Sequence, residues 1–211
     1  MRIGAVVIGL FSMLLGCVEL DVPLYDQTVD YKTACESVAT VATLNYLGYD
    51  VTIDEFLDKY LDTVGMWDNE VFNRDDNVFD HYFVGDPRTS QGLLCNPPVI
   101  VEAVGEYFDS VGEKELRALD TSGVGFRVLI DEVAKGNPVV LWITHGCENT
   151  EARDWYGSSF FARSHTVVLS GYDLDKGVVY ITDSVDGYVE IPYSQAKDNY
   201  EFAGMRSVVI K

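Results

Sequence analysis

One cysteine of the chain occupies a position that favours a reactive thiol. The residues Thr33-Ala34-Cys35-Glu36 have the spacing of a capping box, in which Thr33 and Glu36 would cap each other's backbone amides. This pattern predicts that a helix begins at Cys35. Unpaired amides and the helix dipole favour a thiolate in a first turn, so Cys35 is the candidate nucleophile. The alternative interpretation is a small buried core residue.

A thiolate nucleophile needs a base, and the base needs a partner that orients it. The chain has three histidines. His81 lies in a polar connection and His145 follows a predicted strand, whereas His165 opens a predicted strand. Asp183 ends the next strand after a tight turn, and an antiparallel pair brings the start of one strand near the end of the other. We therefore expect Asp183 to orient the His165 imidazole.

The elements that would position these residues divide the chain into a helical half and a strand-rich half. Helices are predicted at 35–47, 52–61, from 96 onward and at 125–135, and strands at 138–144, 165–171, 177–182, 188–191 and 207–210. Residues 63–94 form a long, partly structured connection. This order predicts an α+β fold in which the nucleophile helix packs on a C-terminal antiparallel sheet, with the site in the groove between the halves.

Composition restricts the classes of function. The chain has 211 residues, of which 47% are hydrophobic, and a net charge of −19, with 34 acidic and 15 basic residues. The hydrophobic content excludes disorder and predicts one globular domain, and the scarcity of basic residues argues against a nucleic-acid partner. No cluster has the spacing of metal ligands, so we expect no metal and no cofactor, and we expect a monomer.

The first residues differ from the acidic remainder. Residues 3–16 are apolar or small, a run too short for a spanning helix and typical of an export signal. Leu14-Leu15-Gly16-Cys17 resembles the lipobox at which a bacterial signal peptidase cuts before a cysteine that becomes lipidated. We expect residues 1–16 to be a signal peptide and 17–211 the mature domain, anchored to the membrane only through Cys17. Arg2 is the only basic residue before Cys17. Because a signal peptide normally begins with a positively charged region, this single charge leaves plain secretion as the alternative.

Several blocks of the chain resemble the papain-like cysteine peptidases, most closely the branch related to bacteriocin-processing (double-glycine leader) peptidases, cysteine peptidase family 39. The matching blocks are Gln27, residues 34–37, 44–49, 84–88 and 136–144, His165-Thr166-Val167-Val168-Leu169-Ser170-Gly171-Tyr172-Asp173 and residues 179–184. The departures are Ala34, where Gly is usual, and Ser184, where Pro often follows the aspartate. The resemblance covers nearly the whole mature chain and implies a papain-like fold.

The resemblance also implies the roles of the site residues. Cys35 would be the nucleophile, His165 the general base and then acid, Asp183 its orienting partner, and Gln27 an oxyanion-hole donor beside the Cys35 amide. The implied activity is hydrolysis of a peptide or protein through a thioacyl-enzyme. The alternatives are an acyltransferase or transglutaminase-like enzyme on the same triad, and a catalytically silent peptide-binding homologue at the cell surface.

Two cysteines are left without a role. Cys95 and Cys147 could form a disulfide in an oxidising exterior, or stay as two separate buried thiols. The sequence leaves both possibilities open, because it does not give the distance between their Cα atoms.

Overall fold

The computed structural model describes residues 16–75 and 77–211. The predicted signal segment, except for Gly16, lies outside the described residues. No helix in the described ranges is long and apolar enough to cross a membrane.

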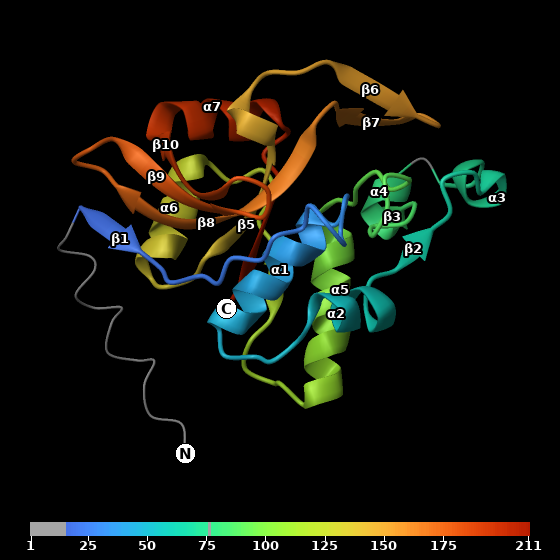
Figure 1. Cartoon of the computed structure of the whole chain (residues 1–211), viewed down its shortest axis with the longest axis horizontal. Helices are drawn as coiled ribbons and strands as arrows, with labels where there is room; N and C mark the ends of the chain where they lie inside the picture. The colour runs from blue at the N-terminus through green and yellow to red at the C-terminus, as the bar shows by residue number, and fades with distance from the viewer. Residues whose placement is uncertain (1–15, 76) are drawn as a thin grey trace.

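Helices dominate the first half of the chain and strands the second half, as the sequence predicts (Figure 1). The helices are α1 (Cys35–Tyr46), α2 (Ile53–Lys59), α3 (Asn69–Phe72), α4 (Val78–His81), α5 (Pro97–Val111), α6 (Phe126–Ala134) and α7 (Tyr193–Phe202), with one 3-10 segment at His145–Cys147. The strands are β1 (Cys17–Glu19), β2 (Thr63–Val64), β3 (Phe83–Val84), β4 (Ala118–Asp120), β5 (Val139–Thr144), β6 (Ala152–Trp155), β7 (Ser158–Phe161), β8 (Ser164–Asp173), β9 (Val178–Asp183), β10 (Gly187–Pro192) and β11 (Ser207–Ile210).

The main sheet is antiparallel and runs in the order β10-β9-β8-β5-β11-β4. The short strand β1 pairs with the far end of β8, where Cys17 lies opposite Asp173. All five predicted strands are present in this sheet. The sheet therefore confirms the α+β prediction and supplies the rigid frame for the second half of the candidate site.

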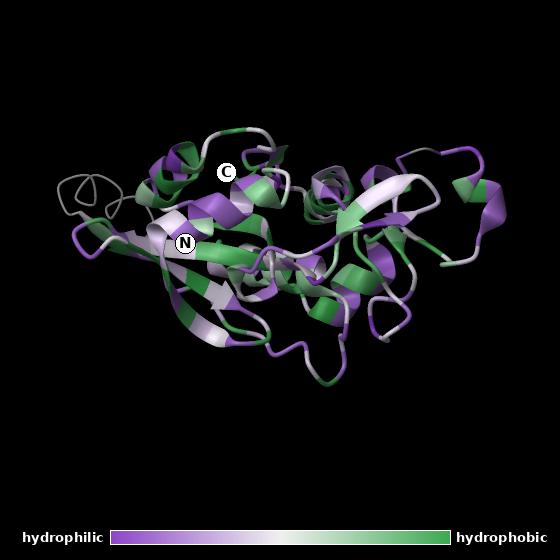
Figure 2. Ribbon diagram, turned by 90° about the horizontal axis from the view of Figure 1, so that it is seen from above, coloured by the Kyte–Doolittle hydropathy of each residue, from purple (hydrophilic) through white to green (hydrophobic). Residues whose placement is uncertain are grey.

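Both faces of the sheet are covered, and β5 shows this most clearly because all its residues are buried. Val140 and Trp142 pack with α1, α2 and α5, whereas Leu141 and Ile143 pack with α6 and α7 on the other face. This alternation follows from the two-residue period of a strand. Figure 2 shows hydrophobic residues gathered along the central strands and hydrophilic residues in the peripheral loops.

The start of α1 differs from the predicted capping box. Ala34 is the N-cap and makes no side-chain cap, and the Thr33 hydroxyl donates instead to the backbone carbonyls of Asp86, Pro87 and Thr89. The Glu36 carboxylate accepts from the Cys95 amide rather than from Thr33. The helix begins at the predicted residue, but the prediction of its cap is wrong, because tertiary partners from distant loops bind the groups that a local box would have paired.

The other helix starts follow the sequence more closely. Thr52 caps α2 by accepting from the Glu55 amide. Pro97 and Pro98 occupy the first turn of α5, where the missing amide protons cost nothing, and Gly112 ends that helix in the left-handed conformation.

The connection 63–94 is a small packed unit, with its own hydrophobic cluster against the β6–β7 hairpin. Its aromatic residues pair with those of the hairpin: Trp67 with Trp155, Phe72 with Tyr156 and Phe79 with Phe160, at ring-centroid distances of 5.1, 4.6 and 5.7 Å. These contacts join the two halves of the chain, as Figure 1 shows where the hairpin extends over α4 and β3.

Removing the side chain of Asn199 is expected to destabilise the fold. This buried amide on α7 accepts from the Thr144 amide at 2.9 Å and donates to the Thr144 hydroxyl at 2.7 Å. Asn199→Ala leaves both groups without this partner, so we expect a loss of about 1–3 kcal/mol in the free energy of unfolding. Urea unfolding measures it, with exposed Asp198→Ala as the control. Equal stability of the two variants would contradict the expectation.

Candidate active site

Cys35 is the first residue of α1 and is only 7% exposed. Its thiol donates to the Glu36 carboxylate, with 3.3 Å between Sγ and Oε2. Burial and the charge of Glu36 raise the pKa of the Cys35 thiol well above its usual value, although contacts from Thr166 oppose the rise. A free thiolate is therefore costly here, and the sulfur would react as an anion only when a nearby cation balances its charge.

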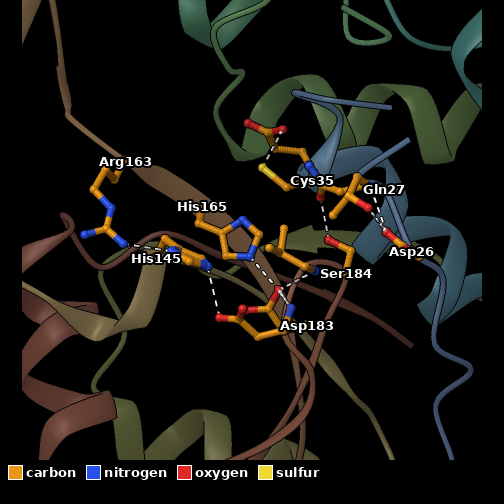
Figure 3. A network of polar contacts seen from close by, with 12 residues as sticks. Asp26, Gln27, Cys35, His145, Arg163, His165, Asp183 and Ser184 are labelled. Carbon is orange, nitrogen blue, oxygen red and sulfur yellow. Dashed lines mark hydrogen bonds and ion pairs between the residues drawn. The ribbon is translucent and has the colours of Figure 1, made fainter. Parts of the chain in front are cut away.

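His165 and Asp183 lie together, as the hairpin argument predicts. The imidazole Nε2 lies 2.8 Å from the Asp183 carboxylate, and both side chains are buried. This contact uses Nε2, so Nδ1 is the ring nitrogen that Asp183 does not bind. Figure 3 shows the His165 ring between Asp183 on one side and Cys35 on the other. The structure thus brings the three predicted residues into one cluster, from α1, β8 and the end of β9.

Asp183 is held as an anion. Burial raises the pKa of its carboxyl, but hydrogen bonds from His165 and from the amides of Val185 and Asp186 outweigh burial, so the pKa is lowered. A carboxylate that stays ionised orients the imidazole and stabilises its protonated form. This geometry allows His165 to gain and lose a proton while its ring stays in place.

The other two histidines have different partners. His81 pairs with Asp75 at 2.6 Å, and that contact is the main reason why its pKa is raised. Nε2 of His145 lies 2.9 Å from the Asp186 carboxylate, and its Nδ1 lies 2.9 Å from the Arg163 guanidinium. Its ring meets the His165 ring edge to face, with centroids 5.3 Å apart. His145, for which the sequence suggests no role in the site, is thus a neighbour of the cluster.

Gln27 lies in the segment before α1 and is 4% exposed. Its backbone amide donates to the Ser184 carbonyl at 3.1 Å, and its side-chain Oε1 accepts from the Ser184 hydroxyl. Because Ser184 holds the oxygen end of the amide, the NH₂ group is turned away from Ser184. The carbonyl oxygen of Lys32 lies 3.5 Å from that nitrogen. Because this distance is long for a hydrogen bond, the NH₂ group is only weakly bound. Figure 3 shows Gln27 and Ser184 beside Cys35.

Two further residues belong to the site. The sequence predicts a helix-capping role for Glu36, but its carboxyl contacts the Cys35 thiol and the Cys95 amide. Ser184, which departs from the family pattern, donates a hydrogen bond to the Gln27 side chain. A polar residue directly after a nucleophile or directly after its orienting aspartate is a signal that could have found both.

The remaining cysteines are unbonded. Cys95 and Cys147 are two separate buried thiols and do not form the disulfide that the sequence left possible. Cys17 is exposed at the start of β1. In the described parts of the chain, no group of three or more His, Cys, Asp or Glu side chains is arranged to hold a metal ion.

Comparison with known proteins places the chain in a family. Residues 19–208 match the Peptidase_C39 like family. No curated protein matches the chain.

Several solved structures are similar to this chain, and the first of those below, with a TM-score above 0.5, supports the same fold. A protein described as a C39-like peptidase from Bacillus anthracis aligns with a TM-score of 0.79 and 21% identity, over 92% of this chain and 97% of the other. A double-glycine motif protease from an AMS/PCAT transporter, in complex with the leader peptide, aligns over 92% and 93% at 15% identity with a TM-score of 0.49. Xylellain, a cysteine protease from Xylella fastidiosa, aligns over 93% and 85% at 16% identity with a TM-score of 0.45.

The match spans Cys35 at the start of α1, the His165–Asp183 pair and most of the sheet that carries this pair. The chain belongs to the Peptidase_C39 like family and is a cysteine peptidase.

Proposed function

We propose that this protein is an exported cysteine peptidase that hydrolyses peptide bonds through Cys35, His165 and Asp183. One observation carries the proposal: the buried His165–Asp183 pair, 2.8 Å between Nε2 and Oδ1, lies beside the thiol at the N-terminus of α1. A thiol, a base and an orienting carboxylate are the groups that nucleophilic hydrolysis of an amide needs.

The chemistry follows from the charges of the site. The Cys35 proton moves to Nδ1 of His165, and the sulfur attacks the carbonyl carbon of the substrate. Burial disfavours an isolated thiolate, so the imidazolium, held by Asp183, supplies the balancing charge. His165 then gives the proton to the leaving amine, which leaves a thioester on Cys35. Water attacks that thioester as His165 accepts its proton, the bond between the carbonyl carbon and the sulfur breaks to release the peptide acid, and His165 returns the proton to Cys35.

Negative charge develops on the carbonyl oxygen during both attacks. The Cys35 amide, at the N-terminus of α1, and the Gln27 side-chain NH₂ are the donors that we assign to this oxyanion. Ser184 supports the assignment because it accounts for the orientation of the Gln27 amide. A preoriented donor needs no reorganisation during the reaction, which is the physical basis of its effect on rate.

Membership of the family supports a peptide or protein as the substrate. The leader peptide seen with the double-glycine motif protease belongs to that protein and does not define the substrate of this one. The four side chains of the proposed site are at most 7% exposed, so a substrate would reach the sulfur with an extended, narrow segment rather than with a bulky surface.

The location is part of the proposal. Cys17 is exposed at the start of β1, which leaves its thiol accessible for lipidation after a cut before it. The proposed lipid anchor would hold the domain at an extracytoplasmic membrane surface.

Cys35→Ala is expected to abolish peptidase activity, because the thioester cannot form without the sulfur. Cys95→Ala and Cys147→Ala are matched controls, since both remove a buried, unbonded thiol outside the proposed triad. Both controls should retain most of the wild-type activity. A fluorogenic peptide library measures hydrolysis, and an added amine nucleophile separates it from acyl transfer. Hydrolysis by Cys35→Ala equal to that of the wild type would refute the mechanism.

Loss of the Ser184 hydroxyl is expected to lower kcat and leave KM nearly unchanged, because Gln27 acts on the transition state. Ser184→Ala removes one hydrogen bond of ~1 kcal/mol, about a fivefold loss in kcat. Gln27→Ala removes the donor itself, and we expect about a 100- to 1000-fold loss.

Ser184→Thr should restore activity, since it keeps the hydroxyl. Ser170→Ala, a buried β8 serine that bonds Tyr180, is the control. Steady-state kinetics measures all four variants. A kcat for Ser184→Ala equal to that of Ser170→Ala would refute the role of Ser184.

Cys17→Ser is expected to release the protein from the membrane fraction of a bacterial host, because serine cannot take the thioether lipid. Metabolic labelling with an alkyne fatty acid should mark the wild type and miss the variant. An unlabelled wild type recovered in the medium would favour plain secretion instead.

A further inference from the structure

The buried carboxyl of Glu36 touches the reacting atom and has no part in the mechanism above. Its side chain is 1% exposed. One oxygen accepts from the Cys35 thiol, with Oε2 3.3 Å from Sγ, and the other accepts from the Cys95 amide at 3.1 Å. The two contacts fix the carboxyl against the sulfur on one side and against the loop before α5 on the other.

Few other ionisable groups face this carboxyl. Cys35 lies on the same helix, Cys95 on the loop before α5, and His165 on β8, close enough to act on it through its charge. In the described ranges, no lysine or arginine forms an ion pair with Glu36. Burial raises the pKa of its carboxyl to about 7, although hydrogen bonds from its own amide and that of Cys95 oppose the rise. Glu36 therefore changes charge near neutral pH, beside the nucleophile.

We propose that Glu36 is a catalytic residue of this site, whose protonated carboxyl donates a hydrogen bond to the Cys35 thiolate and whose carboxylate holds the thiol in its protonated form. This inference rests on the proposed function, since it concerns the same nucleophile. It follows from the contact between Sγ and Oε2, which allows a hydrogen bond in either direction.

The protons of the two forms balance. In the competent form, the thiol proton has moved to His165, and Glu36 keeps its own proton and shares it with the sulfur. The site then carries one thiolate, one imidazolium and a neutral acid, beside the Asp183 anion. In the other form Glu36 has lost its proton to solvent, and its carboxylate accepts from the S–H group. A thiolate there would face a second negative charge on Glu36 in a buried site, which raises the pKa of the thiol.

The direction of the pH effect follows. Below pH about 7 most Glu36 side chains are protonated and support the thiolate. Above it the carboxylate opposes the thiolate, so the reactivity of Cys35 rises less with pH than that of a thiol without this neighbour. The fraction of molecules in the competent form therefore falls as Glu36 loses its proton with rising pH.

Glu36→Gln tests this inference, because glutamine stays neutral, can donate to the sulfur and can accept from the Cys95 amide. The rate of Cys35 alkylation by iodoacetamide, followed by mass spectrometry of the Cys35 peptide between pH 5.5 and 8.5, reports the thiolate without a substrate. We expect the variant and the wild type to agree within about twofold at pH 6, and the variant to react about tenfold faster at pH 8, the effect of one unit in the thiol pKa.

Glu132→Gln is the matched control. Glu132 is another buried carboxylate, but its partners are Lys135, Asn137 and Lys211, and they hold its pKa at about 2 against the effect of burial. Its variant should keep the wild-type pH profile of alkylation. A variant-to-wild-type ratio for Glu36→Gln that stays constant across the pH range would overturn the inference.

A measurement on the unaltered protein covers the case in which Glu36→Gln fails to fold. Side-chain carboxyl ¹³C NMR of selectively labelled protein should show one glutamate, assigned by difference, that titrates near neutral pH and shifts in Cys35→Ala. Ordinary titration of every glutamate near pH 4 would overturn the inference. These outcomes are separate from the proposed function, which fails only if Cys35→Ala or His165→Ala retains peptidase activity.

Discussion

The packing of α1 against β5 and β8 is the contact on which the rest of the structure depends. The helix is buried along its first ten residues, and its Val38, Val41 and Leu44 belong to the same hydrophobic core as Val140 and Trp142 of β5 and Val168 of β8. A helix so deeply enclosed has a fixed position relative to the strands. The sulfur at its N-terminus is therefore held near His165 on β8 by the packing of the core and not by a flexible loop. Sites carried on such elements are held more precisely than sites on loops.

The same burial controls the chemistry of the site. Water is largely excluded, so each charge must be balanced by its neighbours. Asp183 is stabilised as an anion by a direct hydrogen bond from His165 and by two backbone amides, whereas Glu36 bonds only amides and a thiol, and burial raises the pKa of its carboxyl to about 7. Two carboxyls on opposite sides of the cluster thus differ in charge state because their partners differ. That difference agrees with the roles that we propose for them, in which Asp183 orients His165 and Glu36 changes charge with pH beside Cys35.

The second half of the molecule supplies the remaining constraints. The hairpin β6–β7 packs its aromatic residues on those of 63–94, so the two halves are joined away from the nucleophile as well as at it. Ser184, directly after Asp183, reaches back to Gln27 near the N-terminus. The turn that ends β9 therefore carries both the partner of His165 and the residue that orients Gln27, the proposed oxyanion donor.

Local pattern in the sequence was enough to place the main helices and the five predicted strands, because periodicity, prolines and glycines act over a few residues. It also brought His165 and Asp183 together, since a tight turn between two strands determines which residues are neighbours. The pattern did not reveal β6–β7, α7 or the contacts made by Thr33 and Glu36 at the start of α1. These features depend on contacts between residues that are far apart in the chain. One example is the hydrogen bonding of the Thr33 hydroxyl to the backbone carbonyls of Asp86, Pro87 and Thr89.

The sequence by itself determined the candidate residues, which are a cysteine at a helix start and a histidine and an aspartate at strand ends, and it indicated the family that they resemble. Only the tertiary structure decided how those groups are charged and held. Glu36 contacts the thiol rather than the Thr33 amide, and Ser184 holds Gln27, because the fold brings together loops that are distant in the chain. The physical reason is that burial and hydrogen-bond partners set the pKa of a side chain, and both are properties of the packed molecule.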